Sequence, residues 1–343
     1  MTGNSVNGSG NGARSGAHTL ALLAAPLNTL ILRALASGAR QQAELRRSAG
    51  SPAQSTLRAQ LKRLADIGAI EKRRRNRFPG VLEYELTPAG HSLLFVVDVL
   101  ELWLAENPDG PLRLGESAAR AAIKSLAESW STTMLRALAA RPLSLTDLDR
   151  VIPALSYPSL ERRLASMRLA GHVQARRGDR RGTPYAITAW LRRGIAPLLA
   201  AIRWEREHQR AAAPLIAPLD IEAAFLLALP LLHLPEQVTG SCRMAAEIVN
   251  GQKSRLAGAV VQIEHGEVVS CSTQLNGRPD SWAVGSAMAW LDALVEHDIV
   301  RIEFGGDSRL ARTGIDGLHR ALFRPRDDSQ LDVGCKISKD GLH

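Results

Sequence analysis

The sequence predicts a mainly α protein that ends in an α+β domain, and three observations favour this class. The 343 residues are 45% apolar but only 4% aromatic, so Leu and Ala must fill most of the interior, which is typical of helices. Apolar residues recur at helical spacing from Leu20 onward, and one stretch of this pattern occurs twice. Beyond residue 218, short apolar runs with turn residues alternate with helical segments. We therefore expect two similar helical domains at 18–110 and 111–210 and an α+β domain at 219–325.

The charge changes sign along the chain. Within a net charge of +9, residues 1–213 hold 31 Lys and Arg against 17 Asp and Glu, whereas residues 214–343 hold 12 against 17. A basic segment of this kind indicates a polyanionic partner such as double-stranded DNA, and the acidic segment would repel the same partner. Two separate functions are therefore expected.

The termini, the apolar runs and the cysteines argue against export and membrane insertion. Residues 1–17 are rich in Gly, Ser and Asn and are expected to be a disordered tail, and residues 326–343 a loose one. The apolar runs 20–27 and 225–234 are too short to span a bilayer, and the first leads directly into a repeated unit. Three widely spaced cysteines exclude a disulfide scaffold and a thiolate zinc site. The sequence predicts a cytoplasmic protein without a membrane partner.

An internal repeat is the most informative feature of the sequence. Residues 32–36 (LRALA) recur identically at 135–139, an offset of 103, and this offset is kept through the following helices. After a charged turn that is two residues shorter in the second copy, Tyr84 corresponds to Tyr185. A register held over this length indicates a duplicated domain, because an insertion or deletion is tolerated best in a loop.

Each copy predicts three helices, a two-stranded hairpin and a closing helix, which together form a winged helix-turn-helix. The third helix has apolar residues at i, i+4 and i+7, and a glycine follows its last turn. In the first copy the elements are expected at 27–37, around Leu45, around Leu57 to Leu64, and at 69–74, 81–87 and 93–104; in the second, at 130–140, around Leu148, around Leu160 to Met167, and at 172–177, 185–188 and 191–204.

The α+β domain follows a linker rich in Pro and Ala at 211–218. Residues 264–267 (EHGE) predict a tight hairpin turn. The elements are expected as a helix at 221–232, strands at 241–248, 257–264 and 267–274, a helix at 284–296, a strand at 299–304 and a helix at 308–323.

The outward faces of the two third helices are candidate DNA-reading surfaces, because the third helix of this motif enters the major groove. A polar and basic face is also typical of a solvated helix, but each copy adds a basic cluster at its hairpin turn, where it can lie along phosphates. In the second copy Tyr157 and Glu161 belong to the outward face, and Glu161 would read a cytosine amino group or oppose phosphate, which predicts weaker binding. The expected DNA-binding residues are Gln54, Ser55, Thr56, Arg58, Lys62, Arg63, Arg73, Arg74, Arg75 and Arg77 in the first copy and Ser159, Arg162, Arg163, Arg176, Arg177, Arg180 and Arg181 in the second.

Two segments of the first copy resemble a known family. Residues 81–90 (VLEYELTPAG), followed by 100–103 (LELW), are similar to the wing and last-helix signature of HxlR-type winged-helix transcriptional regulators. The second copy is more diverged, with Trp130 and residues 183–188 (TPYAIT) at matching places. The resemblance covers about residues 20–208 and implies a DNA-binding regulator.

The chain departs from that family in two ways. Members usually have one such domain per protomer and form dimers, whereas two copies in one chain could form a pseudo-dimer, with or without further dimerisation. Several members carry a sensing cysteine before the first helix, but no cysteine precedes Cys242 here, so thiol sensing is not expected.

The C-terminal domain resembles the sterol carrier protein type 2-like fold. The similar segments are residues 260–263 before the turn at His265, the pair Trp290-Leu291, residues 304–307 (FGGD) and the end of the last helix. The resemblance implies a cavity between sheet and helices that binds an apolar molecule, although ordinary core packing would account for the same side chains. The residues expected near such a pocket are Phe225, Leu229, Trp282, Met288, Trp290 and Phe304.

These features predict a transcriptional regulator whose two reading helices bind DNA half-sites about one helical turn apart, with an apolar small-molecule effector that changes their spacing. Two other classes remain open: a hydrophobic-metabolite carrier whose basic half docks on anionic surfaces, and a sequestering or protein-interaction module whose wings pair subunits. No catalytic residue, metal or cofactor is expected, because the chain has no HExxH, GxSxG or Walker-type motif.

Overall fold

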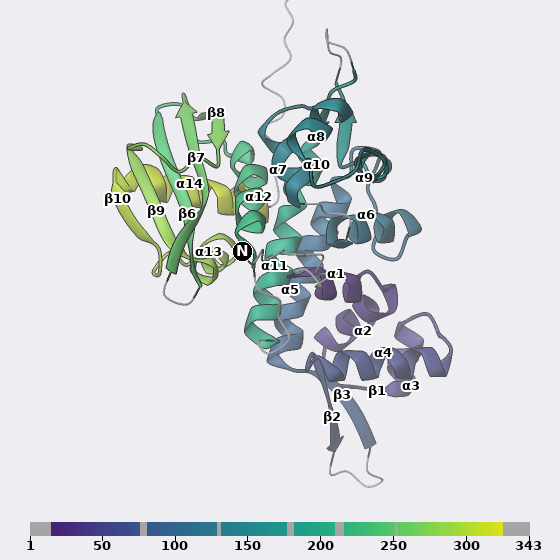
Figure 1. Cartoon of the computed structure of the whole chain (residues 1–343). Helices are drawn as coiled ribbons and strands as arrows, with labels where there is room; N and C mark the ends of the chain where they lie inside the picture. Colours follow the sequence, from purple (N-terminus) through teal and green to yellow (C-terminus); the bar gives the residue numbers. More distant parts are fainter. Residues whose placement is uncertain are drawn as a thin grey trace, which may run out of the picture.

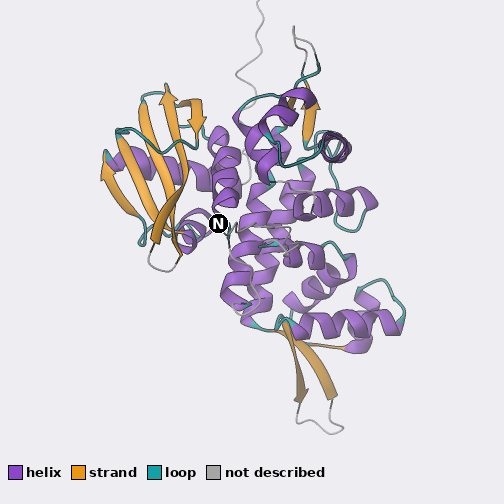
Figure 2. Ribbon diagram, viewed as in Figure 1, coloured by secondary structure: helices purple, strands orange, loops and turns teal. Residues whose placement is uncertain are grey.

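The computed structural model describes residues 15–75, 81–128, 132–176, 182–209, 216–250 and 253–324. Two helices, α5 (Pro88–Ala105) and α11 (Ile195–His208), pack against each other in the middle of the molecule (Figure 1). Smaller helices and two hairpins lie on one side of this pair, and a five-stranded sheet lies on the other (Figure 2). The chain therefore combines a helical N-terminal part with an α+β C-terminal part.

The first helical unit forms the elements that the sequence predicts, but the closing helix expected at 93–104 begins earlier, at Pro88, where the Thr87 hydroxyl caps it. Leu57, Leu61 and Leu64 are buried along one face of the third helix, because residues at this spacing share a face. A short strand before the second helix pairs with the hairpin and gives a three-stranded sheet in the order β1-β3-β2. The elements are α2 (Pro26–Ala36), β1 (Arg40–Gln41), α3 (Gln42–Ser48), α4 (Gln54–Asp66), β2 (Ile70–Arg75), β3 (Val81–Leu86) and α5.

The tail predicted over 1–17 does not include residues 15–17. Helix α1 (Ala17–Leu23) begins at Ala17, and Gly16 before it is already buried. The buried carboxylate of Glu205 on α11 accepts hydrogen bonds from Gly16 N (2.7 Å), Thr19 N (3.0 Å) and the Thr19 hydroxyl (2.9 Å). A carboxylate in this position satisfies the unpaired N–H groups of a helix start and interacts favourably with its dipole. The beginning of α1 is thus fixed to α11.

Residues 132–208 form three helices, a two-stranded hairpin and two closing helices, and the described residues among them lack a counterpart of strand β1. Leu160, Leu164 and Met167 are buried on one face of α9, as predicted. The single closing helix expected at 191–204 is instead two helices that meet at Gly194, since Pro197 lacks an N–H and cannot continue the helical bonding. Trp130 lies outside the described residues. The elements are α6 (Ser117–Glu128), α7 (Thr132–Ala140), α8 (Leu145–Val151), α9 (Tyr157–Leu169), β4 (Val173–Ala175), β5 (Tyr185–Ile187), α10 (Ala189–Arg193) and α11.

Helices α4 and α9 end in the same way. Gly68 and Gly171 have φ angles of 73° and 70°, which favour glycine, and in both cases the next N–H bonds to the carbonyl five residues earlier at 2.9 Å. The hydroxyls of Thr87 and Thr188 then donate to the carbonyls of these two glycines. Each hydroxyl also accepts the N–H three residues later, at the start of the closing helix. The same cap therefore joins the third helix, the hairpin and the closing helix in both segments.

Among the described helices, α5 is long and apolar enough to cross a membrane by length and composition, and α1 with α2 would qualify only across an 81° bend. In the fold, α5 is a core helix. Leu93, Val97, Leu100 and Leu104 are fully buried, and the helix packs along α11. Packing on several sides accounts for its apolar composition.

The C-terminal part is a five-stranded sheet in the order β10-β9-β6-β7-β8, in which β6 and β9 are parallel and the other neighbours are antiparallel. Its inner face, with Met244, Val261 and Ala283 buried, packs against helices that separate it from α11. Residues 264–267 form the predicted hairpin turn, with positive φ at His265 and Gly266. The elements are α12 (Pro218–Ala228), a 3-10 turn η1 (Leu229–Leu231), β6 (Gly240–Asn250), β7 (Lys253–Glu264), β8 (Glu267–Ser272), β9 (Ser281–Ser286), α13 (Ala287–Val295), β10 (Glu303–Gly306) and α14 (Ser308–Phe323).

Several expected boundaries in this part are wrong: the strand predicted from 257 begins at Lys253, and the helix predicted at 221–232 is α12, which ends at Ala228 before the turn η1. The helix predicted at 284–296 starts at Ala287, because the preceding residues form the central strand β9 and the Ser286 hydroxyl accepts the Ala289 N–H at 3.1 Å. The strand predicted at 299–304 begins at Glu303. Strand β9 is stabilised by a long-range contact that a sequence pattern does not report: Trp282 lies directly over Gly305, where a Cβ atom would come within 2.2 Å of the indole.

Candidate nucleic-acid interface

The face of α4 opposite its buried leucines is turned to solvent. Polar and basic side chains of this kind can hydrogen-bond to base edges and phosphates. Lys62 is paired with Asp66 at 2.7 Å one turn later, whereas Arg58 and Arg63 form no ion pair within the described part of the chain. The exposed residues include every predicted one: Gln54, Ser55, Thr56, Arg58, Lys62 and Arg63.

The hairpin beside α4 adds exposed cations in different surroundings. Arg73 lies between Glu85 at 2.6 Å and Glu71 at 3.2 Å, so its charge is locally compensated. Arg74 is exposed and forms no ion pair with the described residues. Lys72 lies over the ring of Tyr84, 5.5 Å from its centroid. Of these three cations, Arg74 is therefore the one best placed to interact with a phosphate.

Part of the predicted interface lies beyond what the structure describes. Arg77 of the first hairpin turn and Arg177, Arg180 and Arg181 of the second are outside the described residues, and so is the side chain of Arg75. Their contacts with DNA stay predictions.

Helix α9 presents a different set of side chains at the same place in its segment. Tyr157, Glu161, Arg162 and Arg163 are exposed, and Ser159 is half-buried. Arg176, after β4, is also exposed. The carboxylate of Glu161 lowers the positive charge of this face relative to α4, which fits the predicted weaker interaction with phosphates.

Helices α4 and α9 lie on the side of the α5–α11 pair that faces away from the five-stranded sheet (Figure 1). The two hairpins project from opposite ends of the molecule (Figure 2). The C-terminal part is therefore on the other side of the molecule from the exposed faces just described.

The contact between the two helical segments is reciprocal. The indole N–H of Trp103 on α5 donates to the carbonyl of Trp190 at 2.9 Å, and that of Trp204 on α11 donates to the carbonyl of Ala89 at 2.8 Å. Trp103 and Trp204 are 101 residues apart, and so are Ala89 and Trp190. Trp190 also stacks on Trp103, with ring centroids 4.6 Å apart. Sequence reasoning did not assign these residues a role, although the equal offset of the two tryptophans was the signal for it.

The residues predicted around an apolar pocket are only partly brought together. The rings of Phe225 and Trp290 meet edge to face with centroids 4.9 Å apart, and Leu229, on the turn after the helix that carries Phe225, is buried in the core. Trp282 instead lies over Gly305, Phe304 lies under the guanidinium of Arg312, and Met288 lies beside Arg203 and Arg301. The last three are separate from the Phe225–Trp290 pair.

Two cysteines, Cys242 and Cys271, lie within the described residues. Burial raises the pKa of Cys242 to about 11 and that of Cys271 to about 12, which keeps both thiols protonated. No group of three His, Cys, Asp or Glu in the described part of the chain could hold a metal ion.

Three helices, a three-stranded wing and an exposed basic third helix define the N-terminal segment as a winged helix-turn-helix domain. Residues 23–110 match the family model described as HxlR-like helix-turn-helix, so the chain contains an HxlR-like helix-turn-helix domain at these residues. A solved structure described as the reduced form of the transcriptional regulator YodB from B. subtilis is similar at 24% sequence identity; the match covers 27% of this chain and 90% of that chain, with a TM-score of 0.26. No curated protein matches the chain.

Proposed function

We propose that the chain is a DNA-binding transcriptional regulator in which residues 18–110 and 111–210 are two winged helix-turn-helix units that form a pseudo-dimer within one polypeptide. Helices α4 and α9 are its two reading helices. Their exposed faces provide sequence specificity, and the hairpin cations provide most of the affinity. The protein acts on double-stranded DNA in the cytoplasm.

The reciprocal contact of Trp103 and Trp204 is the observation that carries this proposal. In a twofold-symmetric dimer the same patch of each subunit contacts its counterpart, so every interaction occurs twice. The hydrogen bonds of the two indoles have this relation at a constant offset of 101 residues. The identical caps at Gly68 and Gly171 support the same relation between the two segments.

The C-terminal domain, residues 219–325, is proposed to bind an apolar effector. It packs on α11, the helix that contributes Trp204 to the contact between the two units. Its resemblance to the sterol carrier protein type 2-like fold stays a prediction, and a hydrophobic-metabolite carrier without sequence preference for DNA is the alternative.

The decisive experiment compares DNA from upstream of the protein's own gene with scrambled DNA of equal length and composition, at fixed salt. We expect at least a hundredfold preference for the first, since specific binding exceeds non-specific binding by several orders of magnitude. The double variant Arg58→Ala, Arg63→Ala should lose this preference. The matched control Arg309→Ala replaces an exposed arginine on α14 and should keep it. Equal affinity for both DNAs would favour the carrier. Two chains on one pair of half-sites would contradict the pseudo-dimer.

A further inference from the structure

A cavity of about 70 Å³ lies between α11 and the C-terminal domain. Helix α11 lines it with Leu198 and Ile202, α12 with Ala224 and Phe225, and α13 with Trp290 and Leu294. The cavity is therefore formed jointly by the helical part and the α+β part. It is not the sheet-and-helix pocket that the sequence predicts, although it shares Phe225 and Trp290 with that prediction.

The chemistry of the wall selects an uncharged apolar molecule. Phe225 and Trp290 form a perpendicular pair, and the Trp290 indole N–H is already used by the carbonyl of Ala245 at 2.8 Å. The polar side chains among its lining residues belong to Ser15 and Asp220, and both interact with other residues. The other described lining residues are apolar, so an uncharged apolar molecule loses the least hydration on entering the cavity.

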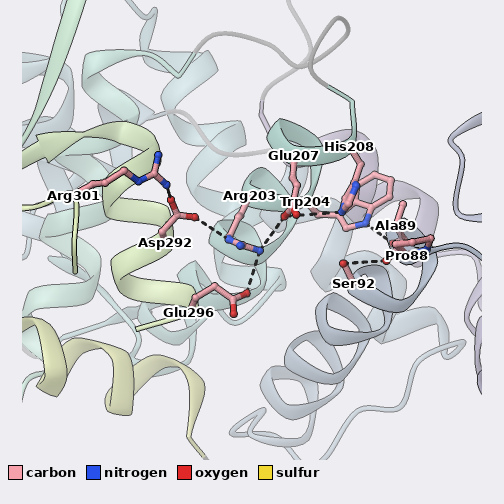
Figure 3. A network of polar contacts seen from close by, with 10 residues as sticks. All are labelled: Pro88, Ala89, Ser92, Arg203, Trp204, Glu207, His208, Asp292, Glu296 and Arg301. Carbon is pink, nitrogen blue, oxygen red and sulfur yellow. Dashed lines mark hydrogen bonds and ion pairs between the residues drawn. The ribbon is translucent and has the colours of Figure 1, made fainter. Parts of the chain in front are cut away.

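The two ends of this domain boundary are held by polar contacts. On one side, Arg203 of α11 pairs with Asp292 at 3.2 Å and Glu296 at 3.1 Å, both on α13, and Asp292 also pairs with Arg301 (Figure 3). On the other side, the guanidinium of Arg192 donates to the carbonyl of Leu226 at 2.9 Å. Polar contacts therefore hold the C-terminal domain on either side of the apolar cavity.

The size of the cavity links ligand binding to movement of α11. An engineered apolar cavity of about 150 Å³ holds benzene, so a ring of this size needs roughly twice the space present here. A ring that displaces α11 from α12 and α13 as it enters binds the expanded state preferentially and increases its population. Because Trp204 of α11 bonds to Ala89 of the first unit, such movement also changes how the two helical segments contact each other.

We propose that this cavity is the effector site of the protein and that it takes an uncharged apolar molecule about the size of one aromatic ring, whose binding alters DNA affinity through α11. The site itself is independent of the proposed DNA-binding function, but its regulatory effect rests on that function.

Titration of the full chain with benzene, followed by ligand-observed NMR, tests the site. We expect saturable binding to the wild type. Ala224→Leu fills the cavity and should lower the affinity for benzene at least tenfold. Leu294→Ala enlarges the cavity and should raise this affinity at least threefold. Trp282→Phe, in the same domain but over Gly305, is the matched control and should bind as the wild type does. If the two substitutions merely destabilised the fold, both would lower the affinity for benzene, so opposite effects point to the cavity itself. Absence of saturable binding, or equal binding by all four proteins, would overturn the proposal.

A second arm measures affinity for the upstream DNA with and without saturating benzene. We expect a change of at least threefold in the wild type and no change in Ala224→Leu. Benzene binding without any change in DNA affinity would overturn the coupling through α11. Sequence-specific DNA binding without benzene binding would overturn the effector site and leave the proposed function standing. Benzene binding by a chain without sequence preference for DNA would overturn the proposed function and leave the apolar binding site standing.

Discussion

The imidazole of His172 occupies the position that Ala69 has in the first unit, 103 residues earlier. It is 3% exposed and packs against the Trp190 ring, with its Nδ1 atom 3.3 Å from the Ser125 hydroxyl. Burial lowers the pKa of His172 to about 4. Since an imidazolium ion in this place would lose its hydration, the folded protein holds the neutral form.

This shift makes the stability of the protein depend on pH. Between about pH 6.5 and 4 the unfolded chain binds a proton at His172 and the folded chain does not, so acidification favours unfolding and stability rises with pH in this window. We expect wild type to lose up to about 3 kcal/mol of unfolding free energy relative to His172→Phe between pH 7 and pH 4. Denaturant titrations at several pH values measure it. The control His18→Gln, at an exposed histidine, should show the same dependence of stability on pH as the wild type. If His172→Phe also showed this dependence, His172 would not be its cause.

Neighbouring hairpin arginines are expected to contribute unequally to DNA binding. Arg74→Ala should reduce the slope of log affinity against log salt by about 0.9, since one phosphate contact is lost. Arg73→Ala should change the slope less, because Glu85 and Glu71 already compensate that charge. The measurement is a salt series on one DNA duplex. A larger effect at Arg73 would show that its ion pairs open on binding.

Both described thiols should be unreactive in the folded protein. Their raised pKa values, about 11 for Cys242 and about 12 for Cys271, leave little thiolate at pH 8. In Cys335→Ser protein we expect no labelling by iodoacetamide under native conditions and labelling of two thiols in denaturant, measured by mass. Loss of DNA binding on mild oxidation of this variant would contradict the expectation that the regulator does not sense through a thiol.

At the scale of helices and strands, the sequence was most informative where local periodicity and caps act together. The apolar stripes of α4 and α9 and their terminal glycines predicted both helices, because a one-sided apolar pattern and a positive-φ residue are local signals. Strand β9 was missed because its position depends on Trp282 and Gly305 from separate segments. Of the candidate interface, the exposed face of α4 was predicted residue by residue, whereas the compensation of Arg73 depends on cross-strand pairing that periodicity does not report.

The pairing of α5 with α11 leads to a prediction for the two tryptophans. Trp103→Phe and Trp204→Phe each remove one indole donor and its hydrogen bond across this contact, which typically costs about 0.5–1.5 kcal/mol. We expect both variants to lower the unfolding free energy and to weaken binding to two half-sites more than binding to a single one. Trp282→Phe is the control for the comparison of half-sites, because Trp282 lies away from this contact. Unchanged two-site binding in both variants would argue against a functional pseudo-dimer.

At the scale of the whole molecule, Arg203 is one of the arginines that join the helical part to the α+β part. Arg203 contacts Asp292 and Glu296, and the Asp292 side chain is only 11% exposed (Figure 3). Arg203→Gln should weaken docking of the C-terminal domain by about 1–3 kcal/mol, since a largely buried carboxylate loses one of its two cationic partners. Faster proteolysis between residues 209 and 218 is the expected readout, with Arg309→Gln as the control. An unchanged cleavage rate would show that docking of the C-terminal domain does not depend on Arg203.

The different side chains of α4 and α9 affect which DNA sequences the protein recognises if both helices bind DNA. A homodimer has two identical reading heads and selects palindromes, but here one head presents Gln54 and Arg58 while the other presents Tyr157 and Glu161. If both helices bind DNA as proposed, they are free to recognise different bases, so the target would need no inverted symmetry. The chain would then bind its target in one orientation, which would give the bound complex a defined direction relative to the transcription start.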